Sequence, residues 1–229
     1  MPKLNEEIKI LWLCLKHGRI LLICKEVLHR LYSDELHFGL RFEINVTLRV
    51  SDAKIPIKIR PLCKKDISKV FTLNERGIAN KEFKDRLNRL FFVKTNIPTC
   101  YVAVTKNDTP CHVHWLIKPS NNEKIQSYFK GGFPKLAADE VLFEGGFTPE
   151  AYRDQKIMPK AMHLIVEKSK RCNARWAIGF VHNKNIPSLK AMKKAGFKPF
   201  MIRHDSWRLF RRKASFISLP PGTPYSFDS

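Results

Sequence analysis

Residues 141–197 combine residue types and spacings that could bind a phosphate group. An apolar, strand-like run ends in Gly145 and Gly146, and the polar turn at residues 153–156 stands directly before an amphipathic helical pattern. The first amides of a helix have no partner within the helix, and the helix dipole gives that end partial positive charge. A tight turn before a helix therefore binds phosphate without any particular side chain, and the Arg and Lys of this turn add charge. An ordinary strand-to-helix connection with solvated charges is the alternative interpretation.

The carboxylate of Glu144, immediately before the glycine pair, is a candidate for proton transfer. Alternation along residues 141–147 puts Glu144 on the same strand face as Leu142 and Gly146. At a substrate cleft, a glutamate on such a strand can take up a proton directly or through water. The alternative is a glutamate that is simply solvated.

Histidine and cysteine residues do not predict a metal site. His112 and His114 share one face of a strand, but the sequence supplies no third ligand nearby, so paired imidazoles are the favoured interpretation. The six cysteines are scattered without CxxC pairs or zinc-ligand spacing, which favours reduced thiols in a cytoplasmic protein over disulfides. Cys172 is either an activated thiol among basic neighbours or a packing residue at a helix end.

Strands and helices must position these candidates, and the hydrophobic periodicity predicts both kinds of element. Expected strands cover residues 55–62, 99–105, 110–117, 141–147 and 175–182, with a hairpin turn at residues 107–108. Expected helices cover residues 64–92 (broken near Gly77), 157–172, and 186–195, which is ended by Gly196. Residues 197–203 and 206–211 are expected to form a closing hairpin around residues 204–205. This order predicts an α/β domain.

The most hydrophobic segment, residues 8–32, precedes this domain and is interrupted at residues 16–19. A membrane-spanning helix needs about 20 predominantly apolar residues, so neither piece is expected to span. The segment is interpreted as a helical hairpin docked on the main domain, with a basic amphipathic helix on a membrane surface as the alternative. We therefore expect an N-terminal helical extension at 1–54, the main domain at 55–213, and a flexible, proline-rich tail at 214–229.

Charge and composition narrow the class of partner. The chain has 229 residues, of which 44% are hydrophobic and 28% charged, so a folded core is expected rather than disorder. The formal net charge of +21 is concentrated in residues 160–213, which predicts attraction to polyanions such as nucleic acid, an anionic membrane or a phosphorylated ligand. The aromatic and basic residues of 197–212 are better explained by a hairpin with one buried face than by base stacking.

Two segments, FTPEAYRDQKIMPKAM and NKNIPSLKAMKKAGFKPF, resemble the GNAT superfamily of acyl-CoA-dependent N-acyltransferases. The resemblance extends over residues 55–212. In that family the turn is R/Q-x-x-G-x-G/A, and the matching residues here are Arg153, Asp154, Gln155, Lys156, Ile157 and Met158. Asn185, Ser188 and the pair Gly196-Phe197 match the downstream element. The resemblance implies a mixed, mostly antiparallel central sheet flanked by helices.

The resemblance also implies an activity and a set of functional residues. Backbone amides of residues 153–158 would grip the pyrophosphate of acetyl-CoA or another acyl-CoA, and the strand ending at Phe147 and Thr148 would splay and pair with the pantetheine arm. Asn185 and Ser188 would flank the cofactor, and Glu144 would act as the base. The amine would attack the thioester directly, without a covalent enzyme intermediate. A small-molecule or peptide amine is the expected acceptor, and an anionic one suits the basic surface.

Three residues depart from the family pattern. Lys156 replaces the middle glycine, Met158 replaces the last small residue, and Met192 stands where many members have a tyrosine that protonates the leaving thiolate. These departures leave a second hypothesis open: a non-catalytic GNAT-like module whose basic surface binds nucleic acid or an anionic membrane. The expected location is the cytoplasm, with peripheral attachment to the inner face of the membrane as the alternative.

Overall fold

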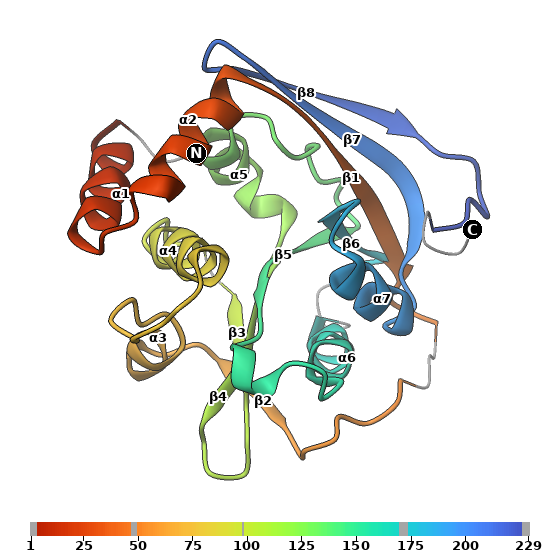
Figure 1. Cartoon of the computed structure of the whole chain (residues 1–229). Coiled ribbons are helices and arrows are strands. Elements are labelled where there is room, and N and C mark those ends of the chain that lie inside the picture. Colours follow the sequence, from red (N-terminus) through yellow and green to blue (C-terminus); the bar gives the residue numbers. More distant parts are fainter. Residues whose placement is uncertain (1–3, 47–49, 98, 170–173, 226–229) are drawn as a thin grey trace.

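One mixed sheet organises the chain (Figure 1). The computed structural model describes residues 4–46, 50–97, 99–169 and 174–225. In the described residues the strand order is β2-β3-β4-β5-β6-β1-β7-β8. The strands are β1 Tyr32–Glu43, β2 Lys58–Pro61, β3 Cys100–Val104, β4 Pro110–Ile117, β5 Glu140–Phe147, β6 Trp176–His182, β7 Lys198–Arg208 and β8 Arg211–Ser218. The one parallel pair among them is β5–β6, so the expected mixed, mostly antiparallel sheet is confirmed.

Helices cover both faces of this sheet. The α-helices are α1 Leu4–Lys16, α2 Ile20–Leu31, α3 Lys64–Val70, α4 Asn80–Val93, α5 Asn122–Phe129, α6 Ile157–Ser169 and α7 Ile186–Lys194, with short 3-10 helices at Pro119–Asn121 and Glu150–Tyr152. Helices α3, α4 and α5 bury Phe71, Phe92 and Ile125 against one face. Helices α6 and α7 bury Met162 and Leu189 against the other. The two covered faces explain why every residue of β4 is buried.

The expected extent of the N-terminal extension requires correction, because residues 32–43 are strand β1. This strand lies between β6 and β7, where His37 is paired with both His182 and Arg203. Phe38, Gly39 and Leu40 are all buried, because both faces of the sheet are covered at this point. The apolar residues Phe38, Leu40 and Phe42 nevertheless alternate with less apolar ones, a period-two pattern that predicts a strand and that the expected boundary overlooked. The boundary expected at residue 55 therefore cuts through the sheet.

Helices α1 and α2 form the helical hairpin that the sequence predicts, docked on α4. Cys14 is buried with Phe83 and Leu87 of α4. Arg19, at the start of α2, donates to the Asn80 side chain at 2.8 Å and lies 5.1 Å from the ring of Phe83. None of the described helices is long and apolar enough to cross a membrane.

The expected closing hairpin around residues 204–205 is wrong: β7 runs through these residues and the chain turns at Leu209 and Phe210. Both turn residues have positive φ. Asp205 resembles a turn residue in the sequence, but its carboxylate is buried and accepts from Arg212 at 2.6 Å. An ion pair thus keeps a carboxylate inside the strand where the sequence suggests a turn.

The expected flexible tail is also corrected for the residues that the structure describes. Strand β8 extends to Ser218, and Tyr225 is buried. The Tyr225 hydroxyl donates to the carbonyl of Phe197, and its ring lies 6.4 Å from that of Phe38. Residues 214–225 therefore belong to the domain, and the remainder of the expected tail lies outside the described residues.

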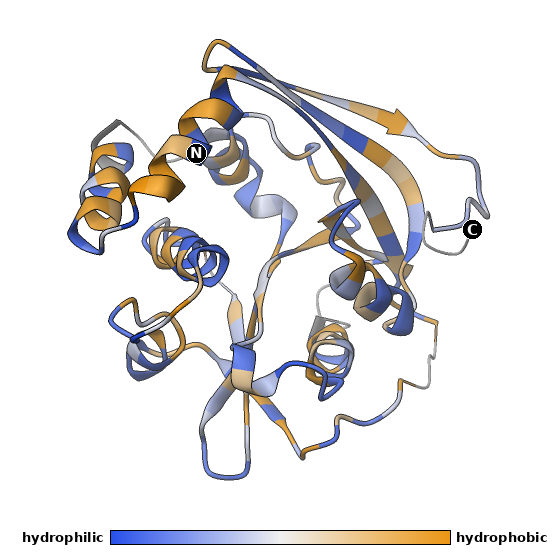
Figure 2. Cartoon of the chain, in the orientation of Figure 1, coloured by the Kyte–Doolittle hydropathy of each residue, from blue (hydrophilic) through white to orange (hydrophobic). Residues whose placement is uncertain are grey.

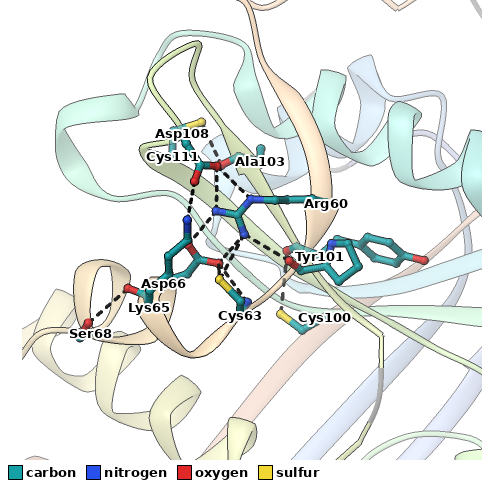
Figure 3. Close-up of polar contacts among 11 residues, drawn as sticks. Arg60, Cys63, Lys65, Asp66, Ser68, Cys100, Tyr101, Ala103, Asp108 and Cys111 are labelled. Carbon is teal, nitrogen blue, oxygen red and sulfur yellow. Dashed lines mark hydrogen bonds and ion pairs between the residues drawn. The ribbon is translucent and has the colours of Figure 1, made fainter.

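Asp66 ties three elements together at the edge of the sheet (Figure 3). Its carboxylate accepts from Arg60 of β2 at 2.6 and 2.9 Å and from the amide of Cys63 at the start of α3 at 2.9 Å. Arg60 also donates to Asp108 in the β3–β4 turn at 3.0 Å. Hydrogen bonds from Arg60 and Cys63 outweigh burial and hold the pKa of Asp66 well below its usual range.

We predict that Asp66→Asn lowers the free energy of unfolding by about 2 kcal/mol at neutral pH, because it leaves the guanidinium without its buried partner. A carboxyl with a lowered pKa stabilises the fold above the unfolded pKa of about 3.9, and this stabilisation is lost as the pH falls through the folded value. The difference between wild type and variant should therefore shrink below about pH 4. Urea unfolding across pH checks this.

The matched control for this comparison is Glu150→Gln, which removes a charge from an exposed side chain and should change stability by less than about 0.5 kcal/mol. A stability gap that stays constant through acid pH would contradict the assigned role of Asp66.

Candidate functional site

Strands β5 and β6 separate in the middle of the sheet. Their parallel pairing runs from Glu140–Trp176 to Phe143–Gly179 and stops there. Beyond this point the pairing of β5 with β4 changes register, and Gly145 has φ of 66°. A Cβ on Gly145 would lie 2.7 Å from the Trp115 ring, so both conformation and space require glycine. The splayed strand that the family resemblance implies is present.

Arg89 of α4 binds the backbone of the separated strand. Its Nε donates to the carbonyl of Gly145 at 3.1 Å and its Nη2 to the carbonyl of Gly146 at 2.7 Å. The guanidinium also lies 5.3 Å from the ring centre of Phe147. Burial lowers the pKa of Arg89, but an arginine remains charged at neutral pH. This side chain therefore supplies donors where a neighbouring strand would otherwise supply them.

A cavity of about 300 Å³ opens beside the split, and Glu144 lies in its wall. The lining residues come from β1, α4, β4, α5 and the loop after it, β5, α6, β6, α7, β7 and β8. Burial raises the pKa of Glu144, while Arg203 and Arg89 oppose the shift. Of the two interpretations of this glutamate, the structure favours a place at a cleft over a solvated one.

Charged side chains give this cavity a positive balance. Arg203 and Arg212 both pair with Asp205, at 2.9 and 2.6 Å. Together with Arg89, three arginines thus line a space whose wall also contains Glu144, while Asp205 pairs with two of them from outside the lining. His37 adds no charge, because burial and Arg203 lower its pKa to about 2.

His112 and His114 are buried imidazoles, as the sequence favours. Their ring nitrogens lie 3.3 Å apart, and Nδ1 of His112 lies 2.8 Å from the hydroxyl of Thr148. Burial lowers the pKa of His112 to about 3 and keeps both rings neutral. Within the described ranges no three His, Cys, Asp or Glu side chains cluster in a way that could hold a metal ion.

A larger cavity of about 930 Å³ adjoins the first, between α4, the loop after β5, and α7. Basic residues outnumber acidic ones in its lining, and apolar side chains including Phe147 and Ile186 complete it. Five residues line both cavities: Arg89, Gly146, Met158, Asn185 and Ser188. The two spaces therefore meet at the split between β5 and β6.

Most of the cofactor-binding residues expected from the sequence line the larger cavity. These are Phe147, Thr148, Arg153, Asp154, Lys156, Ile157, Met158, Asn185 and Ser188. Gln155 is the exception: its side chain donates to the Ala151 carbonyl at 3.2 Å, and its own carbonyl accepts from the Lys54 amide at 2.9 Å. The hydrogen bonds of Gln155 therefore stabilise the turn.

The turn at residues 153–156 contains no glycine, but two of its residues have the positive φ angles that glycine adopts. Asp154 and Lys156 have φ of 60° and 56°, in the left-handed region that glycine favours. The expected contribution of Arg153 is corrected, since its amide already donates to the Glu150 carbonyl at 3.1 Å. Its side chain pairs with buried Glu82 of α4 at 2.6 Å instead of adding free charge. The amides that remain for an anion begin at Asp154.

Helix α7 supplies the third wall. Asn185 caps it, accepting from the Ser188 amide at 3.4 Å. Met192 is buried one turn further along and lines the smaller cavity, against the backbone of Gly179. A methionine donates no proton, so the departure noted in the sequence remains at this position. Cys172 lies outside the described residues.

Sequence reasoning missed the basic side chains of the smaller cavity. Arg89, Arg203, Arg212 and His182 come from α4, β7, β8 and β6, and the fold alone brings them together. The single signal in the sequence was the placement of Arg89 inside an apolar helical pattern, which is equally typical of an ordinary amphipathic helix.

Comparison with known proteins identifies the fold. No protein-family model matches the sequence, and no curated protein gives a significant match. Solved structures do match. One is a functionally unknown conserved protein from Staphylococcus epidermidis, which is 11% identical to this chain with a TM-score of 0.50. The match covers 78% of this chain and 63% of that protein. A GCN5-related glucosamine N-acetyltransferase region of a fungal multi-domain β-N-acetylglucosaminidase matches with 13% identity, 76% and 21% coverage, and a TM-score of 0.52.

A GNAT-family acetyltransferase from Colwellia psychrerythraea matches at 11% identity over 84% of this chain and 59% of that one, with a TM-score of 0.45. The chain spans less than two thirds of the length of each of these three structures. Identities this low show the fold alone. The chain has the GNAT fold, as the sequence resemblance implied.

The left-handed conformation of Lys156 generates a stability prediction. Lys156→Gly should raise the free energy of unfolding by about 1 kcal/mol, because glycine adopts positive φ without the Cβ penalty. Lys156→Ala is the control: it removes the same side chain but keeps the Cβ, and should change stability by less than about 0.5 kcal/mol. Equal urea midpoints for the two variants would show that the turn is unstrained.

Proposed function

We propose that this protein is an acyl-CoA-dependent N-acyltransferase that moves an acyl group from a thioester to an amine. The meeting of two cavities at the split between β5 and β6 carries the proposal. One cavity has a mainly basic lining beside a helix N-terminus, and the other has the carboxyl group of Glu144 in its wall. Such a junction suits a reaction between a long anionic donor and a small acceptor.

The residues of the larger cavity fit an acyl-CoA. The amides that follow Arg153 stand at the N-terminus of α6, where an anion is stabilised. Lys156 has the backbone conformation that a glycine would adopt, and its ammonium supplies a point charge for a phosphate. Phe147, Thr148, Asn185 and Ser188 would flank the rest of the molecule. When bound, acyl-CoA supplies an acyl group activated as a thioester.

Glu144 is the proposed base. Its raised pKa brings the carboxylate closer to the proton affinity needed to deprotonate an ammonium group. The neutral amine would then attack the acyl carbon, the C–S bond would break to release the thiolate, and the nitrogen would lose its second proton to the thiolate or to water. The first proton would pass from Glu144 to water. The protein holds the amine near the acyl group, and this orientation supplies much of the rate.

The departure of the thiolate does not require the missing tyrosine. A thiol ionises near pH 8.5, so its thiolate leaves without a strong acid. Met192 instead contributes an apolar part of the wall of the smaller cavity.

The positive balance of the smaller cavity defines the acceptor further. Arg203 and Arg212 both pair with one carboxylate, that of Asp205, which neutralises only one of their two positive charges. A negative group on the acceptor would neutralise the other. The rings of Phe129, Phe133 and Phe180 line the same space. We propose a small amine that carries a carboxylate or a phosphate.

Calorimetric titration with acetyl-CoA and longer acyl-CoAs tests the donor site. We expect binding at micromolar concentration, and both Lys156→Ala and Lys156→Gly should weaken it by about 1 kcal/mol because both lose the same charge-assisted contact. Lys198→Ala, an exposed lysine outside both cavities, should leave affinity unchanged. Absence of binding below millimolar concentration would contradict acyl transfer and favour a non-catalytic module.

Glu144→Gln tests the base. It should lower kcat by roughly a hundredfold or more and leave the KM for acyl-CoA nearly unchanged, since the amide cannot take up a proton. In the wild type, kcat/KM for the acceptor should rise with pH through a pKa above the usual glutamate value, and the variant should lose that step. Steady-state kinetics at several pH values measure both effects.

Glu140→Gln is the matched control, because Glu140 lies on the same strand outside both cavities, where a glutamine oxygen can still accept from the Ala137 amide. The acceptors in these assays should be pairs of small amines that differ by one carboxylate or phosphate, with the lower KM for the anionic member. An unchanged rate and pH profile in Glu144→Gln would remove Glu144 from the mechanism.

A further inference from the structure

The outer sides of α1 and α2 carry an apolar surface that no described part of the chain covers. On α1, Ile8, Leu11, Trp12 and Leu15 are exposed at the spacing of a single helix face, with Trp12 58% exposed. Figure 2 shows that both helices are rich in apolar residues along their length. A contiguous exposed apolar patch on a folded protein marks an interaction site.

The apolar stripe of α2 runs beside it. Ile20, Leu21, Val27 and Leu28 are exposed on this helix, with Leu21 at 69% and Leu28 at 64%. The opposite sides of α1 and α2 pack against α4 through residues such as Cys14. The outward residues are therefore held in place by a docked hairpin and do not result from a loose helix.

The turn between β7 and β8 extends this surface. Leu209 and Phe210 at its tip are 77% and 55% exposed, and their amides donate to the carbonyls of Leu31 and Arg30 at the end of α2. Tyr32, at the junction of α2 and β1, is 70% exposed and packs under the guanidinium of Arg208 at 4.0 Å. We call the outward stripes of α1 and α2 together with this turn the apolar face.

Charges around the apolar face are sorted by sign. The carboxylates of Glu7 and Glu26 form ion pairs with Arg30 at 3.5 and 2.9 Å. Glu26 also pairs with Lys84 at 2.7 Å. The lysines of the two helices, at positions 9, 16 and 25, are exposed, as is Arg211 after the turn. The exposed carboxylate of Asp34 near this turn pairs with Arg208 at 2.7 Å. Among the exposed side chains described here, the charges without an opposite partner beside the apolar face are therefore positive.

We propose that the apolar face docks this protein on an anionic lipid bilayer. Exposed leucines, a tryptophan and a tyrosine bounded by lysines match the requirements of an element that lies in the interface of a membrane, with its apolar side buried by about 5–10 Å. The net charge of +21 adds attraction to the whole molecule. A second copy of this chain fits less well, because pairing two such faces would oppose lysines with lysines. This proposal does not rest on acyl transfer.

Co-sedimentation of the full chain with vesicles tests the proposal. The protein should bind vesicles of phosphatidylcholine and phosphatidylserine, and bind vesicles of pure phosphatidylcholine much less. Raising the salt from about 0.1 M to about 1 M shortens the screening length from about 10 Å to about 3 Å and should release most of the protein.

Matched variants separate the apolar face from general surface charge. Leu21→Glu and, independently, Leu28→Glu should each weaken vesicle binding by roughly tenfold or more, because a charge replaces an inserted apolar side chain. Ile217→Glu makes the same change at a 59% exposed residue on β8, outside the apolar face, and should weaken binding by less than about threefold. All three residues are exposed, and thermal unfolding verifies that the variants fold.

Three results would overturn the proposal. The first is failure of the wild type to bind phosphatidylserine vesicles. The second is an equal loss of binding in Leu21→Glu, Leu28→Glu and Ile217→Glu, which would assign the binding to diffuse charge. The third is a dimer in size-exclusion chromatography that Leu21→Glu dissociates, which would assign the apolar face to a second copy.

Discussion

The structure around the candidate site depends on one interaction, the contact of Arg89 with the carbonyls of Gly145 and Gly146. A strand that leaves its neighbour in the middle of a sheet exposes backbone groups that cost free energy if they stay unpaired. The guanidinium supplies two donors in a fixed fork, so β5 can separate from β6 and still be stable. Both cavities lie at this separation.

Helix α4 consequently contacts several parts of the chain that lie far apart in the sequence. Through Arg89 it stabilises the split, and through Glu82 it binds Arg153 and fixes the turn before α6. Its Phe83 and Leu87 receive the N-terminal hairpin. The turn before α6, the bulged strand and the N-terminal helices that carry the apolar face therefore all contact α4.

Locally encoded elements were predictable from the sequence, and elements defined by distant contacts were not. The β3–β4 hairpin, α6, and α7 with its Asn185 cap and the following Gly196 follow from nearby residues. Strand β1 was overlooked although Phe38, Leu40 and Phe42 alternate with less apolar residues, and its place between β6 and β7 depends on contacts distant in the sequence. The course of β7 escaped because ion pairs with Arg203 and Arg212 retain Asp205 in the interior. For the candidate site, the turn and Glu144 were visible in the sequence, whereas the arginines converge only in the folded chain.

The position of β1 has a consequence for how the chain acquires its structure. Residues 32–43 pair with residues 176–182 and 198–208, so their hydrogen-bonding partners are synthesised more than 130 positions later. Closing such long loops costs entropy before any contact repays it, which makes folding slow. Until β6 and β7 emerge from the ribosome, β1 has two unprotected edges and is exposed to aggregation. The backbone groups of this early segment are thus paired in the sheet only after a late segment of the chain has been made.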